Sequence, residues 1–180
     1  MDDNSDKLVY TIEIRKRAGA KWIELKDKLT DKKFELDTKT LEDGRYEIRV
    51  TASDRPSNTT ANDQQVHFGS PFIASRISDP FVVDNTAPAI EKVLADVKDR
   101  SVTINLSLKD AFSAIGKVSY TIDSSKDFQS VLPNDMVYDT AEEEFVIKID
   151  DMEKGAHIIA LKIADSVNNT IYKMLDVEIK

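Results

Sequence analysis

Five acidic or amide side chains stand where predicted strands end, at positions suited to binding an ion. They are Asp54, Asp84, Asn85, Asp110 and Asp165. Calcium takes six to eight oxygen ligands of this kind, so a calcium site at the junction of the two halves of the chain is the main ligand hypothesis. The simpler interpretation is that each side chain caps its own turn through backbone hydrogen bonds. We therefore assign no metal-binding or cofactor-binding residue, and calcium at the junction stays an open question.

The sequence offers no convincing set of catalytic side chains. It contains no Cys, which excludes a thiolate zinc site and a cysteine nucleophile. Glu142, Glu143 and Glu144 form the densest carboxylate run, but they precede a predicted strand, where successive side chains point to opposite faces. The two histidines, His67 and His157, are too few for a metal site. We therefore predict no catalytic residue and expect that the protein is not an enzyme.

Composition limits the class of protein and its partners. The chain has 180 residues, 41% of them hydrophobic, and a net charge of −8. This apolar content is typical of folded domains. The negative charge argues against a nucleic-acid partner. No run approaches the roughly 18 apolar residues that span a bilayer, so we expect no membrane insertion of this segment.

Apolar residues alternate with polar ones over several segments. In residues 46–52, 102–108 and 118–122, every second side chain is apolar. Such alternation is typical of half-buried antiparallel strands, and no segment keeps the helical period of 3.6. Residues 89–99 could form a strand or a short helix, and their β-rich surroundings favour the strand. The sequence therefore predicts an all-β protein.

Two stretches of the chain match each other at a constant spacing. Residues 34–54 and 145–165 share apolar, turn and acidic positions in the same order, 111 positions apart. Upstream, Tyr10 and the residues after it match Tyr120 and its followers at a spacing of 110. We interpret these matches as an internal repeat.

Two matched pairs within the repeat concern single side chains. Tyr46 follows the turn residue Gly44 by two positions, where a Tyr of a Greek-key sandwich can bond a backbone group at the corner. His157 takes the equivalent place, so we interpret it as a structural substitute for that Tyr rather than as a catalytic residue. Asn58 and Asn169 also match at 111, and no role is assigned to them.

The strongest break in the chain lies at residues 84–88. Its sequence, Asp-Asn-Thr-Ala-Pro, combines turn-forming residues with a proline that restricts the residue before it. A boundary there gives two domains, residues 1–84 and 85–180, each near the roughly 100 residues of a small β-sandwich.

These features resemble a known group of proteins. The alternating pattern at 44–54, the Ser57-Asn58 pair and the segment 78–88 are similar to bacterial immunoglobulin-like or fibronectin type III-like tandem repeats. The resemblance implies an all-β fold of two tandem Ig-like or fibronectin type III-like antiparallel β-sandwiches. It also implies a place in a large secreted or envelope protein, extracellular or periplasmic. Other domains of the parent chain, or envelope proteins, would then be the partners.

The first predicted sandwich lacks counterparts of two strands. At the spacing of 111, the counterparts of residues 89–97 and 101–109 would precede residue 1. We therefore expect either a shorter first domain or a C-terminal fragment of a larger protein, with Met1 as an expression start. Residues 55–80 are predicted to be a long inserted loop with a short strand pair.

The function that follows is that of a non-catalytic structural or interaction module. The alternative is a carbohydrate- or polymer-binding accessory module of an extracellular enzyme. Trp22 is the only Trp, and alternation in residues 21–25 would leave its indole partly exposed, as sugar stacking requires. The competing interpretation is that Trp22 covers the edge of the core beneath Lys side-chain stems.

Overall fold

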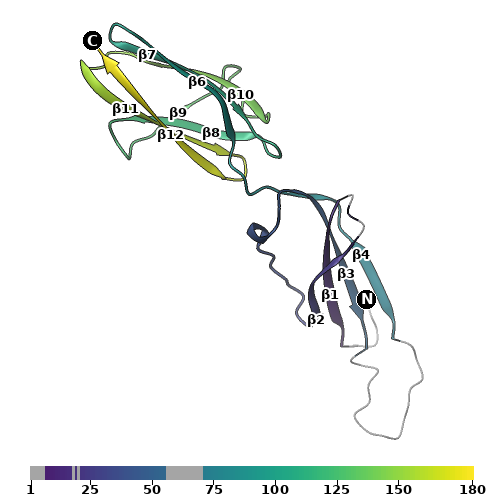
Figure 1. Ribbon diagram of the computed structural model, residues 1–180. Helices are drawn as coiled ribbons and strands as arrows, with labels where there is room; N and C mark the ends of the chain where they lie inside the picture. The colour runs from purple at the N-terminus through teal and green to yellow at the C-terminus, as the bar shows by residue number, and fades with distance from the viewer. Residues whose placement is uncertain (1–6, 18, 20, 56–70) are drawn as a thin grey trace, which may run out of the picture. The chain divides into compact units, whose positions relative to one another are not determined.

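A computed structural model describes residues 7–17, 19, 21–55 and 71–180 (Figure 1). The chain divides into two units, Met1–Val83 and Asp84–Lys180, called unit 1 and unit 2 below. The predicted boundary lies one residue further along the chain. All strand pairings are antiparallel, as expected from the alternating sequence pattern.

The described residues of unit 1 form a single antiparallel sheet. Its elements are β1 (Val9–Lys16), β2 (Ile23–Leu29), the short 3-10 helix η1 (Thr38–Thr40), β3 (Gly44–Ser53), β4 (Ile73–Ile77) and β5 (Phe81–Val83). The strand order is β2-β1-β3-β4, and β5 also pairs with β3. Pro80 lies between β4 and β5, and it interrupts the pairing because proline has no N–H to donate to a neighbouring strand.

The core of unit 1 is small. Ile14, Tyr46 and Val83 are buried in it, and partly buried side chains such as Leu36 and Phe81 pack against them. The described part of unit 1 shows no second sheet facing the first.

The predicted long loop at 55–80 is described only in part. Residues 56–70 lie outside the described residues. Within 71–80, β4 pairs with β3 along five residues and so extends the sheet of unit 1.

Unit 2 consists of two antiparallel sheets. Its strands are β6 (Ala89–Lys98), β7 (Ser101–Lys109), β8 (Ile115–Ile122), β9 (Gln129–Val131), β10 (Glu142–Ile149), β11 (Gly155–Asp165) and β12 (Thr170–Ile179). One sheet has the order β10-β7-β6 and the other the order β12-β11-β8-β9 (Figure 1). The segment that could have been a short helix is the strand β6.

One hydrophobic core joins the two sheets of unit 2. Phe145 and Leu106 from the first sheet belong to the same buried cluster as Leu161 and Val118 from the second. Every second residue of β10 is buried, as the alternating sequence predicts. Two antiparallel sheets packed over one core make an Ig-like or fibronectin type III-like β-sandwich, so the predicted all-β fold class is confirmed.

The strands β3 and β11 are central in their sheets, but their neighbours are aligned differently from the sequence match. Ile12 pairs with Val50, while Tyr120 pairs with Leu161. Since Val50 and Leu161 are 111 positions apart, Ile12 corresponds to Tyr120 at a spacing of 108. The predicted spacing of 110 is therefore wrong by two residues. A shift of two keeps the same side chains facing inward, because a strand alternates with period two.

Candidate metal centre

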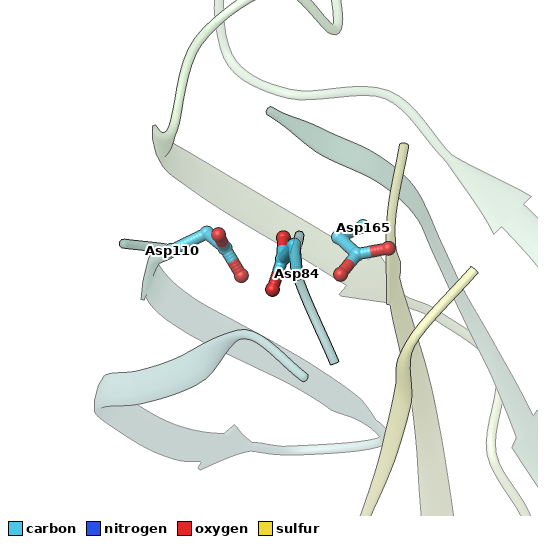
Figure 2. Close-up of side chains that lie close together, drawn as sticks. All are labelled: Asp84, Asp110 and Asp165. Carbon is cyan, nitrogen blue, oxygen red and sulfur yellow. The ribbon is translucent and has the colours of Figure 1, made fainter. Parts of the chain in front are cut away.

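Three aspartates meet at one end of unit 2. Asp84 is the first residue of the unit, Asp110 directly follows β7, and Asp165 is the last residue of β11. Each offers one carboxylate oxygen, and these three oxygens lie within 4.8 Å of one another. Figure 2 shows the Asp84 carboxylate between those of Asp110 and Asp165.

The end of β7 fixes the position of Asp110. Its backbone N–H donates to the carbonyl of Ala141 at 2.7 Å. Its Oδ1 accepts the N–H groups of Phe112 at 2.9 Å and Ser113 at 2.8 Å, which closes the turn after the strand. The turn-capping interpretation of this residue is therefore correct for Oδ1.

Asp165 lies at an irregularity between β11 and β8, where the register shifts after Ala164. Its Oδ1 accepts the N–H groups of Val167 at 2.9 Å and Asn169 at 2.8 Å. Gly116 of the neighbouring strand allows the close approach, because a Cβ there would lie 2.4 Å from the carbonyl oxygen of Asp165. A bulge of this kind changes the direction of a side chain at a strand end.

Asn169 connects Asp84 to Asp165. Its side-chain Nδ2 donates to Asp165 Oδ2 at 2.7 Å and to the backbone carbonyl of Asp84 at 3.1 Å. Asp84 Oδ1 accepts the N–H of Thr86 at 3.2 Å. The other oxygen, Asp84 Oδ2, is buried and has no hydrogen-bond partner. Asn169 thus holds the backbone of Asp84 beside the loop that carries Asp165.

Two of the three aspartates are buried, and Asp84 is partly buried beside them. Asp110 is 7% exposed and Asp165 is 3% exposed. Within residues 71–180, no Lys, Arg or His forms an ion pair with any of the three. Two like unit charges 4 Å apart repel by about 4 kcal/mol at an effective dielectric constant of about 20. A cation with a preference for oxygen ligands would relieve this repulsion, so these are the residues able to hold a metal ion.

The structure brings together three of the five residues that the sequence proposed for calcium. Asp54 belongs to unit 1, where its Oδ1 accepts the N–H of Phe72 at 2.9 Å. Asn85 follows Asp84 directly and contributes no carboxylate. Asn169 and Gly116 are two residues of the site for which the sequence predicted no role. The sequence match between Asn58 and Asn169 was the signal that could have pointed to Asn169.

The carboxylate run before β10 has other partners. Glu142 forms an ion pair with Lys109. Glu143 is buried and accepts hydrogen bonds from the N–H and hydroxyl of Thr140 at 3.2 and 2.9 Å. Neighbouring carboxylates of the run point to opposite faces of the strand, as its alternating burial shows. This arrangement anchors the start of β10 and does not form a pair of facing acids.

Tyr46 and His157 make the same contact in their respective units. The hydroxyl of Tyr46 donates to the carbonyl of Glu42 at 2.8 Å, and His157 Nε2 lies 2.8 Å from the carbonyl of Glu153. In both cases the acceptor is four residues earlier in the chain. The prediction that His157 replaces a structural Tyr is therefore confirmed.

Trp22, the candidate for sugar stacking, is covered by two arginines. The guanidinium carbons of Arg15 and Arg49 each lie 4.5 Å from the centre of its ring system. Arg15 also pairs with Glu47, and Arg49 with Glu13, so both guanidinium groups are held in place. Burial of Trp22 beneath basic stems was the competing interpretation, and the residues that cover it are Arg rather than Lys.

No protein-family model matches the chain, and no curated protein matches it. Among solved structures, the chain is similar to the crystal structure of the chicken CNTN1 FN1–FN3 domains, with 14% identity and a TM-score of 0.42. The match covers 97% of this chain and 56% of the other, so this chain spans a little over half of that structure's length. In the described part of the chain, no helix is long and apolar enough to cross a membrane.

Proposed function

We propose that the chain is a non-catalytic structural and interaction module that binds a β-sheet partner through unit 1. The resemblance of its sequence to bacterial tandem repeats supports a place in a larger secreted or envelope protein. The partner would then be another domain of that protein or an envelope protein, outside the cell or in the periplasm.

The observation that carries this proposal is the apolar inner face of the unit 1 sheet. A hollow of about 450 Å³ lies over it, lined by Tyr10, Ile12, Phe34, Ile48 and Val50 among others. Apolar atoms dominate the lining. Phe34 and Val50 in this lining are 37% and 36% exposed. Apolar side chains exposed over a regular sheet are typical of an interaction site.

Unit 2 indicates what kind of partner fits this face. Val50 in unit 1 corresponds to Leu161 in unit 2. Leu161 is fully buried beneath the sheet of β6, β7 and β10, whereas Val50 is 36% exposed. A partner that supplies two or more antiparallel strands with inward apolar residues would bury Val50 in the same way. We therefore favour a β-sheet element as the occupant of the face.

The alternative of carbohydrate binding lacks a supporting observation. Sugar stacking needs a free face of an aromatic ring, and Arg15 and Arg49 lie over Trp22. We therefore do not propose it.

The test adds a β-sheet partner for the apolar face of unit 1 to the same chain. Residues 88–114, which contain β6 and β7, are copied and placed before residue 7 in exchange for residues 1–6. In the register of the two sheets, β1 of unit 1 corresponds to β8 of unit 2. The copy therefore stands before β1 in the same way that β6 and β7 stand before β8. Trp22 fluorescence reports the unfolding of unit 1 in urea. We expect its urea midpoint to be higher with the copy than in the wild type, and the dye ANS to bind more weakly.

Two versions of the copy serve as matched controls. Leu106→Asp changes a buried inward side chain, and Asn105→Asp changes the exposed neighbour on the opposite face. The Asn105→Asp copy should stabilise unit 1 and the Leu106→Asp copy should not. If the unmodified copy changes neither the midpoint nor the ANS signal, the face does not accept a β-sheet partner and the proposal is wrong.

A further inference from the structure

We propose that Asp84, Asp110 and Asp165 bind one calcium ion at the end of unit 2. This inference is independent of the interaction surface on unit 1. It rests on the three carboxylates, on the way their turns hold them, and on a buried oxygen that no donor satisfies.

The turns fix the three side chains, and they leave Asp84 Oδ2 without a hydrogen bond. Each aspartate uses Oδ1 to accept backbone N–H groups of its own loop. Asp84 Oδ2 is enclosed by protein and receives no hydrogen bond. Asp110 is 7% exposed and uses Oδ1 for the contacts of its turn. A buried carboxylate oxygen without a partner is costly, and in native proteins it calls for a ligand such as an ion.

The chemistry of the donors selects the kind of ion. All three are carboxylates, which suit hard cations such as calcium and magnesium rather than zinc or copper. Calcium binds oxygens at about 2.3–2.6 Å, so two ligands of one ion lie at most about 5 Å apart. The mutual separation of no more than 4.8 Å meets this condition. Calcium also accepts irregular sets of ligands, whereas magnesium demands a near-ideal octahedron.

Binding would join three parts of unit 2 that are distant in sequence. Asp84 opens the unit, Asp110 begins the β7–β8 connection, and Asp165 begins the β11–β12 connection. An ion bound only by the folded state raises stability as its concentration exceeds the dissociation constant. With only three carboxylates, we expect weak binding, within the range of about 10⁻⁴–10⁻³ M known for extracellular calcium modules.

The experiment measures calcium binding by the full chain after treatment with EDTA. Isothermal titration calorimetry gives the affinity for calcium, and circular dichroism gives the melting temperature with and without calcium. The variants are Asp84→Asn, Asp110→Asn and Asp165→Asn, since Asn keeps an oxygen for the turn and removes the charge. We expect at least a tenfold loss of affinity in each. Asp84 lies outside the strands, so Asp84→Asn remains informative if another variant does not fold.

The matched control is Asp54→Asn. Asp54 also follows a central strand and is buried, but it lies in unit 1. This variant should bind calcium with wild-type affinity. In calcium-free buffer, Asp84→Asn should be at least as stable as the wild type, because it removes one of the repelling charges.

Three results would overturn the proposal. The first is no heat and no change in melting temperature at millimolar calcium. The second is an equal response of the wild type and Asp84→Asn, which would indicate general ionic screening. The third is tighter binding of magnesium than of calcium, which would refute the assignment of calcium.

Discussion

His157 and Asp123 form a pair across the β8–β11 edge, with Nδ1 of the imidazole 2.6 Å from Oδ2 of the carboxylate. The other ring nitrogen faces the carbonyl of Glu153. Both ring nitrogens therefore meet acceptors, and only the protonated imidazole can donate to both at once. This corner of unit 2 differs from the Tyr46 corner of unit 1 in carrying a group that titrates near neutral pH.

The first prediction is that the stability of unit 2 depends on the charge of His157. The bond to Asp123, and then that to the Glu153 carbonyl, raises the pKa of His157 above its ordinary value. The stability gained from the protonated form is fully present below about pH 6.5, the unfolded value, and is lost as the pH rises through the raised pKa. The pKa of Asp123 is lowered, chiefly by the N–H of Ile158 and then by His157. Its contribution is lost only as the pH falls through that lowered pKa.

Urea midpoints between pH 5 and pH 9 test this first prediction. They should decline with pH through the pKa of His157 in the wild type and stay flatter in His157→Tyr, which restores the kind of corner that Tyr46 makes. Both proteins should also carry His67→Gln, so that His157 is the only histidine of the reference protein and no other histidine contributes to the pH profile. Equal pH profiles for the two proteins would show that the pair does not contribute.

The second prediction concerns the core of unit 2. Phe145 is 1% exposed and lies between the two sheets, so Phe145→Ala should lower the free energy of unfolding by about 3–5 kcal/mol. Its neighbour Val146 points outward and is 42% exposed. Val146→Ala should therefore change the free energy of unfolding by no more than about 0.5 kcal/mol. Urea denaturation followed by circular dichroism measures both. Similar losses in the two variants would contradict the assignment of the faces of β10.

The third prediction is that Gly116→Ala displaces Asp165. The new Cβ would lie 2.4 Å from the Asp165 carbonyl oxygen, and the obstacle is backbone, so the strands must separate. We expect lower stability of unit 2 and weaker calcium binding together. Gly155→Ala is the comparison, since its Cβ meets nothing within 4 Å and its cost comes from a φ of +125°. Gly155→Ala should lower stability without a change in calcium affinity. A similar loss of calcium affinity in Gly116→Ala and Gly155→Ala would argue against a displacement of Asp165.

The fourth prediction concerns the cover over Trp22. Arg15→Gln together with Arg49→Gln removes both cation–π contacts, so acrylamide should quench the tryptophan fluorescence more strongly than in the wild type. The single Trp makes the signal unambiguous. Lys21→Gln serves as a control of charge without a cation–π contact to the ring. Unchanged quenching in the double variant would mean that the arginines do not shield the indole.

Local alternation was sufficient to predict strands such as β7 and its inward face. In β10 and β11, burial follows the period of two that the apolar residues set. The corner contacts of Tyr46 and His157 were also predictable, because the bonded carbonyl lies only four residues away in the chain. Interactions within one strand or one turn need no knowledge of the rest of the fold.

Register and completeness depended on tertiary structure. The predicted match of Tyr10 to Tyr120 was wrong by two residues, because a shift of two leaves the apolar pattern unchanged and the sequence cannot distinguish the alternatives. Phe34 and Phe145 lie in similar sequences, yet only Phe145 is in a strand. The strand at Phe145 exists because β10 pairs with β7, and the described residues of unit 1 provide no counterpart of β7.

The sequence by itself determined an all-β chain with two halves, and it named aspartates at strand ends as candidate ligands. Only the tertiary structure decided that Asp84, Asp110 and Asp165 meet within unit 2, whereas Asp54 belongs to unit 1. The physical reason is that a strand end has a local signature in turn-forming residues, whereas the convergence of three ends depends on how two sheets pack over one core.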